Sequence, residues 1–335
     1  MKIYYIGSFP PTYGGVTIKN KNLYEALREK IDIRRIDMNR IKRGDVREII
    51  RFFWAMLTGR QFIVGLAGQK NRRQFTKLLY RFRRRAMECS VMLVMGGIVD
   101  DMIQEGPAFF DMLRRYRQLY VELPGMVRKL NDSGVLNVMM YPNGRPRPRC
   151  LQAIHSDNGP LRCVFFSQIE PEKGVDRILE TARLISEVRF DFYGRIVPSY
   201  QERFLREIEG LGNASYHGVF TGDSDAVYRE LNQYDILLLP TRCKTEGLPG
   251  ILIEAKIAGI PAAVTGINGN RDIITDGIDG FVLDEDTAQC LEEKLRYLDA
   301  NRDLLTDMKY ASRASAERYY IDICAGDVIR ELERG

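Results

Sequence analysis

Short apolar runs alternate with amphipathic helical patterns along the whole chain, and this alternation limits the possible folds more than any other feature. The first half contains the runs KIYYI, DIRRID, QFIVGLA, CSVMLVM, QLYVEL and LNVMMYP, with helical patterns over 45–58 and 70–87. The second half contains CVFFSQ, RFDFYG, ASYHGVF, DILLLP, PAAVT and GFVL, again with helical patterns between them. Buried strands that alternate with helices favour parallel sheets covered on both faces. The sequence therefore predicts an α/β protein with two Rossmann-like, doubly wound domains.

A segment rich in proline separates the two series of strands. Residues 142–160 (PNGRPRPRCLQAIHSDNGP) contain four prolines and two glycines, a composition typical of a linker. We expect one domain over 1–150, a second over 151–315, and a C-terminal helix over 316–335 that can cross back to the first domain. Two such domains that face each other leave a cleft at the carboxyl ends of their strands, where doubly wound sheets bind ligands.

The composition excludes several other classes of protein. Hydrophobic residues make up 45% and charged residues 28% of the chain, an ordinary globular mixture. The longest apolar stretch, 91–99, has nine residues, whereas a membrane-spanning helix needs about 20. The apolar part of the N-terminus is too short for a secretion signal. The six cysteines form no C-x-x-C pair and there are only two histidines, so we expect no metal site and a cytoplasmic location.

Charge is distributed unevenly between the halves. Residues 1–150 hold 29 Lys and Arg against 13 Asp and Glu, a net charge of +16, whereas residues 151–335 carry −11. Residues 42–85 alone carry +11 and interleave aromatic residues with arginines. This pattern suits contact with an anionic membrane surface. The alternative is that the apolar residues cover the sheet while the arginines face water. We expect no nucleic acid partner, since no binding motif accompanies the charge.

The richest chemical pattern lies in LLLPTRCKTEGLPGILIEAKIAGIP, residues 237–261. A buried strand leads into a polar loop with Glu246, and a glycine-containing turn then opens a helix that carries Glu254. Unpaired amides and the helix dipole favour phosphate at a helix N-terminus, and carboxylates accept hydrogen bonds from sugar hydroxyls. The pattern therefore indicates a cradle for a sugar nucleotide. The alternative is a pair of solvated glutamates at the start of a helix.

The same segment resembles the group 1 family of retaining glycosyltransferases, which includes glycogen and sucrose synthases and bacterial polysaccharide transferases. Glu246 and Glu254 match its E-x₇-E signature, and 255–261 match the A-x-x-x-G-x-P turn that follows. The resemblance continues at 169–179, 216–220 and 266–283, and is weaker at 7–16 and 141–146. It implies the GT-B fold and transfer of a hexose or N-acetylhexosamine from a nucleoside diphosphate, expected to be UDP. The implied acceptor is a glycan or a lipid-linked saccharide in surface polysaccharide synthesis, with no metal or other cofactor, at the inner face of the cell membrane.

The resemblance also implies roles for individual residues. Lys173 would face the donor diphosphate and Glu246 would hold the donor-sugar hydroxyls. The other donor-binding residues that it implies are the amides of Gly247 and Leu248, Glu254 at the ribose, Gly218 and Val219 at the nucleobase, and Gly14 and Gly15 near the phosphates from the first domain.

Two positions depart from the family pattern. Ser167 and Gln168 stand where the family usually has Gly-Arg, so Arg195 or Arg242 would have to supply the second cation, unless both are solvated surface residues. Glu122 stands near the place of a usual histidine. It would contact the donor sugar, activate the acceptor hydroxyl, or act as a structural carboxylate that caps the turn at Pro124.

Neither histidine occupies that place. His155 lies in the linker, and His217 is expected to be a partly buried strand residue. The departures leave a catalytically inactive scaffold of the same fold as an alternative, together with a sugar-nucleotide epimerase. A nicotinamide-dependent oxidoreductase is not favoured, because no G-x-G-x-x-G follows the first strand.

Overall fold

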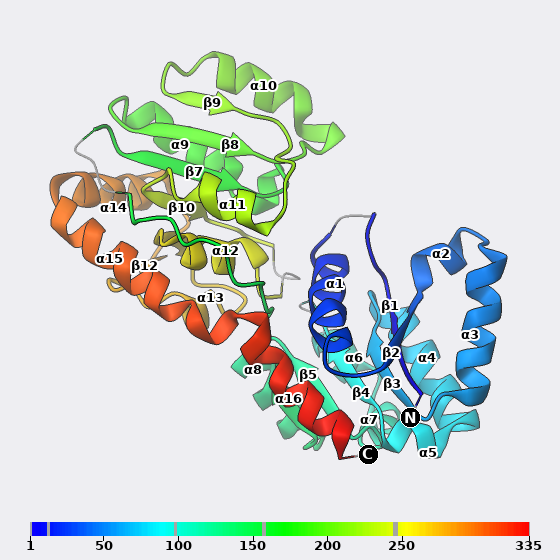
Figure 1. Ribbon diagram of the computed structural model, residues 1–335. Coiled ribbons are helices and arrows are strands. Elements are labelled where there is room, and N and C mark those ends of the chain that lie inside the picture. Colours follow the sequence, from blue (N-terminus) through cyan, green and yellow to red (C-terminus); the bar gives the residue numbers. More distant parts are fainter. Residues whose placement is uncertain (1, 12–13, 97–98, 156–158, 244–246, 335) are drawn as a thin grey trace. The chain divides into compact units, whose positions relative to one another are not determined.

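The computed structural model describes residues 2–11, 14–96, 99–155, 159–243 and 247–334 of the chain. They form two compact units, each built on one sheet (Figure 1). Unit 1 comprises Met1–Pro146, Thr245–Leu248 and Tyr319–Gly335, and unit 2 comprises Arg147–Lys244 and Pro249–Arg318. Each unit is therefore assembled from more than one stretch of the sequence.

Unit 1 contains a parallel sheet with the strand order β2-β1-β3-β4-β5-β6. The order reverses between β1 and β3, which is the switch point of a doubly wound sheet. Its strands are β1 (Ile3–Gly7), β2 (Ile33–Asp37), β3 (Gln61–Gly65), β4 (Val91–Val94), β5 (Gln118–Val121) and β6 (Val138–Met140). Its helices are α1 (Gly15–Arg28), α2 (Met38–Lys42), α3 (Val46–Thr58), α4 (Gln69–Phe82), α5 (Arg84–Glu88), α6 (Val99–Gln104), α7 (Pro107–Leu113), α8 (Pro124–Asp132) and α16 (Ile321–Glu333).

The two faces of the unit 1 sheet bury different side chains, because successive residues of a strand point to opposite faces. On one face Tyr5 of β1 and Leu93 of β4 pack in a core with α1 and with Val328 of α16. On the other face Phe62 of β3 meets Phe75 of α4 edge to face, at 6.3 Å between ring centroids. The last helix of the chain is thus part of the core of the first unit.

Unit 2 contains a second parallel sheet with the order β12-β11-β10-β7-β8-β9, the Rossmann order with its switch point between β7 and β10. Its strands are β7 (Arg162–Phe166), β8 (Arg189–Tyr193), β9 (Ala214–Tyr216), β10 (Ile236–Leu239), β11 (Ala262–Thr265) and β12 (Gly280–Leu283). Its helices are α9 (Val175–Leu184), α10 (Gln201–Glu209), α11 (Ser224–Leu231), α12 (Gly250–Ala258), α13 (Asn270–Ile273), α14 (Ala288–Ala300) and α15 (Arg302–Ser315). The short 3₁₀ helices are η1 (Pro171–Lys173), η2 (Pro198–Tyr200) and η3 (Glu317–Tyr319), of which η3 spans the boundary between the units.

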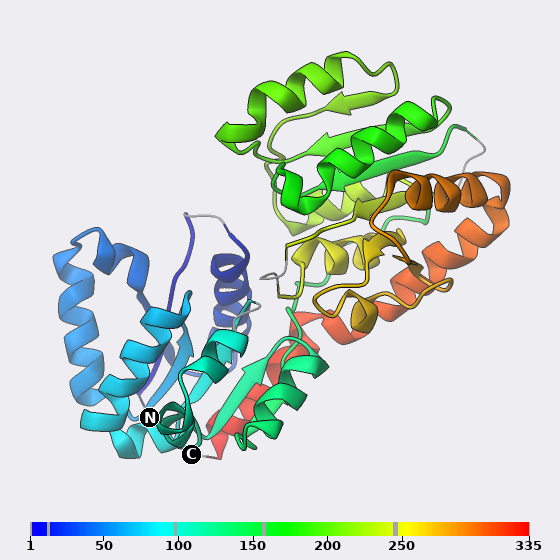
Figure 2. The same cartoon turned by 180° about the vertical axis from the view of Figure 1, so that it is seen from behind.

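Helices cover both faces of each sheet, as the two opposite views show (Figure 2). This arrangement confirms the prediction of an α/β chain with two doubly wound domains. None of the described helices is long and apolar enough to span a bilayer.

Candidate functional site

The switch point of the unit 2 sheet joins the loops that follow β7 and β10. The amide of Arg242 donates to the carbonyl of Glu172 at 2.7 Å, and the hydroxyl of Thr241 reaches the same carbonyl at 3.3 Å. Gly174 has φ +79°, and a side chain there would overlap the backbone of Pro240. Only glycine readily adopts this left-handed conformation and also lets the backbone at 174 approach the backbone of Pro240 so closely. Glycine at position 174 is therefore required for the two loops to pack together.

Lys173 lies at this switch point, at the end of η1 and next to Gly174, the N-cap of α9. Its side chain is buried, at 9% exposure. A lysine so placed brings a compact positive charge to the carboxyl edge of the sheet, where doubly wound domains bind phosphorylated ligands.

Helix α12 begins at the neighbouring loop and provides a second group suited to phosphate. Its N-cap residue, Pro249, makes no side-chain hydrogen bond to the first amides of the helix, which are the backbone donors that a helix leaves without an intrahelical partner. Glu254 lies in the second turn and is half-buried. Glu246, the first glutamate of the signature, lies outside the described residues.

A buried ion pair holds α12 in place. The ammonium group of Lys256 donates to Asp279 at 2.7 Å and to the hydroxyl of Ser315 at 2.8 Å. Burial lowers the pKa of Lys256, and the adjacent carboxylate of Asp279 opposes this shift. Asp279 also accepts from the amide of Thr275 at 2.9 Å, so the pair links α12 to the segment at 266–283 that shares the family pattern.

The two arginines considered as the second cation differ in their surroundings. The guanidinium group of Arg242 donates to both carboxylate oxygens of Asp176 at 2.7 Å and to the carbonyl of Pro171 at 2.7 Å. Arg195, which follows β8, is exposed, and its side chain makes no ion pair among the described residues. The guanidinium group of Arg195 therefore has no carboxylate partner in the part of the chain that the structure describes, whereas Arg242 ties the loop after β10 to η1 and α9.

The remaining predicted donor contacts of unit 2 lie at the ends of β7, β8 and β9. Gln168 is exposed, with its amide 3.3 Å from Glu170. The carbonyl of Gly218 accepts from the amide of Gly194 at 2.8 Å, which connects the loops after β8 and β9. Val219 is exposed, as expected of a residue available to a ligand.

His217 follows β9 and is exposed, so the prediction of a partly buried strand residue is wrong. Its ring stacks on Tyr193 at 4.8 Å and lies 2.6 Å from a carboxylate oxygen of Asp191. The reason is that β9 lies at the edge of the sheet, where one flank of the strand has no neighbour.

Glu122 belongs to unit 1, where it follows β5 and is almost fully buried. It forms an ion pair with Lys19 of α1, which is also buried. Its other oxygen accepts from the amides of Gly96 and Leu248, both at 3.2 Å. Among the described residues the carboxylate of Glu122 bonds only to Lys19 and to these two amides and not to α8, so the alternative in which Glu122 caps the turn at Pro124 is wrong. Lys19 was missed from the sequence, where it is one of many lysines without a motif.

The glycines predicted near the donor phosphates fall into two groups. Gly14 and Gly15 lie at the exposed start of α1, and a side chain on either would meet no atom within 4 Å. At Gly247 a side chain would collide with Glu122 and lie 2.8 Å from the Cα of Gly96. Glycine is thus sterically required at Gly247. The phosphate contacts expected of Gly14, Gly15 and Gly247 all stay predictions.

Two doubly wound parallel sheets, one of them in the Rossmann order with a cationic switch point, define a GT-B fold. A solved structure of Anabaena Alr3699/HepE in complex with UDP is similar over 100% of both chains, with a TM-score of 0.77 and 12% identity. Residues 149–315, which include all six strands of the unit 2 sheet, match the family described as glycosyl transferases group 1.

Curated relatives match shorter parts of the chain. The Vi polysaccharide biosynthesis protein VipC/TviE of Salmonella typhi is 34% identical over 79 residues, 24% of this chain and 13% of the relative. The amylovoran biosynthesis glycosyltransferase AmsK of Erwinia amylovora is 26% identical over 165 residues, 47% of this chain and 40% of the relative. The chain thus spans less than half the length of either relative.

Proposed function

We propose that the chain is a retaining glycosyltransferase that moves a hexose or N-acetylhexosamine from a UDP-sugar to a glycan or lipid-linked acceptor. The observation that carries the proposal is the match of residues 149–315 to group 1 glycosyltransferases, with a buried lysine and an uncapped helix N-terminus at the Rossmann switch point of that segment. The names of the relatives support polysaccharide synthesis, and UDP in the Anabaena complex supports the choice of nucleotide.

In this proposal the donor diphosphate lies at the N-terminus of α12, near Lys173. Negative charge grows on the leaving phosphate as the glycosidic bond breaks, and a preorganised cation stabilises that charge more than it stabilises the ground state. Arg195 supplies the second cation in place of the family arginine. Glu246 holds the donor-sugar hydroxyls and Glu254 the ribose, while Gly218 and Val219 border the base.

The reacting carbon develops oxocarbenium character, as in glycoside hydrolysis. The anomeric configuration is retained, the leaving phosphate takes the proton of the acceptor hydroxyl, and no metal takes part. Glu122 is proposed to act as a positioning residue, because its carboxylate already binds Lys19 and two backbone amides. We place the enzyme at the inner face of the cell membrane, where a lipid-linked acceptor is available to it.

Nucleotide release from a panel of UDP-, GDP- and ADP-sugars tests the proposal. We expect UDP-sugars to be turned over and to raise the melting temperature, since a ligand that binds only the native state stabilises it. Lys173→Ala should lower kcat on the order of 100- to 1000-fold, because it removes one group that stabilises transition-state charge. Glu202→Gln, on an exposed helix of the same unit, is the matched control and should leave kcat unchanged.

The product distinguishes the finer claims. An α-linked product from an α-linked donor, seen by NMR, supports retention, and an inverted product refutes it. Arg195→Ala should raise the KM for the donor more than Arg242→Ala does. Donor binding without turnover, with any acceptor or with water, would identify the inactive scaffold instead.

A further inference from the structure

Helix α3 of unit 1 carries five exposed apolar side chains. The residues Val46, Ile50, Phe53, Trp54 and Leu57 follow the spacing of one helix face and are between 55% and 70% exposed. The opposite face of α3 is the one that packs on the unit, through Ala55 and Glu48, both buried. A surface helix normally carries polar residues on its solvent face. A contiguous apolar face on that side therefore indicates an interaction surface.

The neighbouring helix α4 buries more of its apolar residues than α3 does. Within the basic stretch 42–85, Phe75 and Leu79 of α4 are buried against the sheet, and Arg72 is buried with them. Phe75 and Leu79 of α4 therefore serve the core of unit 1, whereas Phe82 at the end of that helix is 66% exposed. The exposed face of α3 carries five such residues; among them Phe53 meets the ring of Phe52, and the ammonium group of Lys2 lies over the ring of Trp54. Sequence alone could not separate the two helices.

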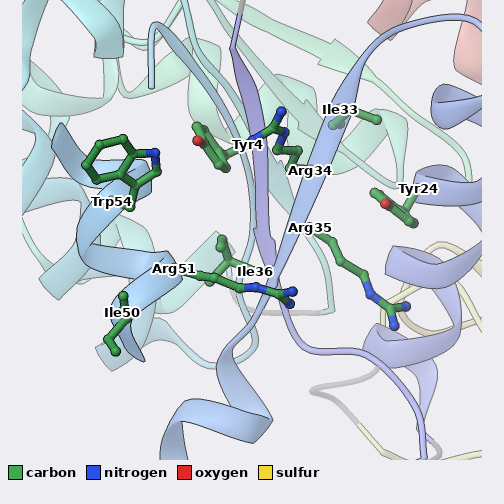
Figure 3. Close-up of a pocket in the computed structure, with 9 residues that line it drawn as sticks. All are labelled: Tyr4, Tyr24, Ile33, Arg34, Arg35, Ile36, Ile50, Arg51 and Trp54. Carbon is green, nitrogen blue, oxygen red and sulfur yellow. The ribbon is translucent and has the colours of Figure 1, made fainter. Parts of the chain in front are cut away.

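A pocket of about 500 Å³ lies beside this face, around the edge strand β2 (Figure 3). Ile50, Arg51 and Trp54 of α3 line one side, so the pocket continues the apolar face. Tyr24 of α1 stands on the other side of the strands. Of the nine described residues that line it, three are arginines and none is acidic.

The three arginines project around β2. In the strand pairing Arg34 lies opposite Tyr4 and Arg35 opposite Tyr5, so the two guanidinium groups leave β2 on opposite faces. Arg34 makes no ion pair among the described residues. Arg35 lies 5.5 Å from the ring of Phe9, and Arg51 pairs with Glu48 at 3.3 Å. Arginine binds phosphate through its planar fork of donors, so the pocket suits a phosphate-bearing ligand.

We propose that this pocket and the exposed face of α3 together bind an acidic phospholipid in a bilayer. The phosphate lies between Arg34 and Arg51, and α3 lies in the plane of the interface with Phe53, Trp54 and Leu57 among the acyl chains. A soluble anion would use the arginines and leave the apolar face in water. A lipid uses both, because its charged head and its hydrocarbon meet at the depth where the pocket meets the face.

The inference rests on the proposed function only for a location at a membrane and makes no use of donor chemistry. The lipid-binding proposal can therefore be refuted while the proposed glycosyltransferase activity stands, and the reverse is also true. The chain contains a single tryptophan, Trp54, so intrinsic fluorescence reports on the proposed surface alone. The experiment adds the whole protein to phosphatidylcholine vesicles with or without phosphatidylglycerol.

We expect binding and a blue shift of Trp54 emission only when phosphatidylglycerol is present, and quenching by lipids with brominated acyl chains. Arg34→Glu/Arg51→Glu should weaken partitioning by at least about 30-fold, since each basic residue near an acidic surface contributes about fivefold. Phe53→Ser/Leu57→Ser should weaken it by about 100-fold, because each side chain loses its transfer into hydrocarbon.

Matched controls lie elsewhere on unit 1. Arg128→Glu reverses an exposed charge on α8, and Leu136→Ser removes an apolar side chain that is 75% exposed. Both should bind vesicles as the wild type does. Circular dichroism checks that each variant is folded. Quenching of Trp54 emission by brominated lipids is measured on the wild-type protein, so this test does not depend on the folding of any variant.

Three results would overturn the proposal. They are equal binding to both vesicle types, an unshifted Trp54 emission on bound protein, and the same emission change with inorganic phosphate as with acidic vesicles. UDP release measured without vesicles reports separately on the proposed catalytic activity.

Discussion

Breaking the buried ion pair between Lys19 and Glu122 should destabilise unit 1 strongly. The two side chains are 8% and 4% exposed, so neither has water to replace its partner. Removing one member of a buried pair costs about 3 to 5 kcal/mol, because the other charge stays buried and unpaired. Unit 1 holds 167 residues by its three ranges. At about 2 to 4 °C per kcal/mol for a domain of this size, Lys19→Met should lower its melting temperature by about 6 to 20 °C.

A double-mutant cycle gives the sharper test. Glu122→Gln keeps an acceptor for the amides of Gly96 and Leu248 but removes the charge, so its cost should come mainly from the isolated ammonium group of Lys19. The double variant should recover part of the loss. Urea unfolding followed by Trp54 fluorescence reports on unit 1 alone, because the chain has no other tryptophan.

A matched pair on the surface of unit 1 calibrates the cycle. Lys129 and Asp100 are 53% and 62% exposed, and their coupling should lie below about 1 kcal/mol. If the coupling between Lys19 and Glu122 is equally small, so that the single effects simply add, the reasoning from burial is refuted.

Three further outcomes are expected. In unit 2, Lys256→Met should cost about 3 to 5 kcal/mol of unfolding free energy, measured by circular dichroism, because it leaves Asp279 buried without its cation; a loss below about 1 kcal/mol would contradict this. The hydrogen bond from Arg40, together with the amide of Glu48, holds the pKa of Asp45 below its usual 3.8. A carboxylate whose pKa is lower in the folded state stabilises that state at pH values above its unfolded pKa. The stability difference between wild type and Asp45→Ala should therefore be complete above about pH 4 and shrink as the pH falls further. A difference in urea midpoint that does not change with pH would contradict this. EDTA should leave kcat for UDP release unchanged, and activity restored only by added metal would refute the metal-independent mechanism.

The sequence was sufficient to predict the strands and the fold class. Each described strand overlaps one of the predicted runs, because burial on both faces of a parallel strand leaves a nearly continuous apolar segment. The glycine-containing turn before α12 was likewise predicted, since a helix N-terminus after a strand has a local signature.

Features set by distant parts of the chain could not be predicted in this way. Lys19 meets Glu122 across 103 positions, and Arg242 meets Asp176 across 66, and neither pair has a local pattern. The exposure of His217 depends on β9 being an edge strand, which is a property of strand order and not of the strand itself. For the same reason the sequence could not distinguish Arg195 from Arg242 as the second cation, because only the structure shows that Arg242 pairs with Asp176.

The placement of α16 in the core of unit 1 has a consequence for biosynthesis. Val328 and Leu332 of α16 pack in a core with β1, β3 and β4, which come from the first third of the chain. The residues of unit 2 lie in the sequence between these strands and α16. At about 5 to 20 residues per second, a ribosome needs roughly 10 to 40 seconds to travel from the end of β6 to α16. During that interval one face of the nascent first sheet has α1 but lacks α16, so the domain that starts first is the one that finishes folding last.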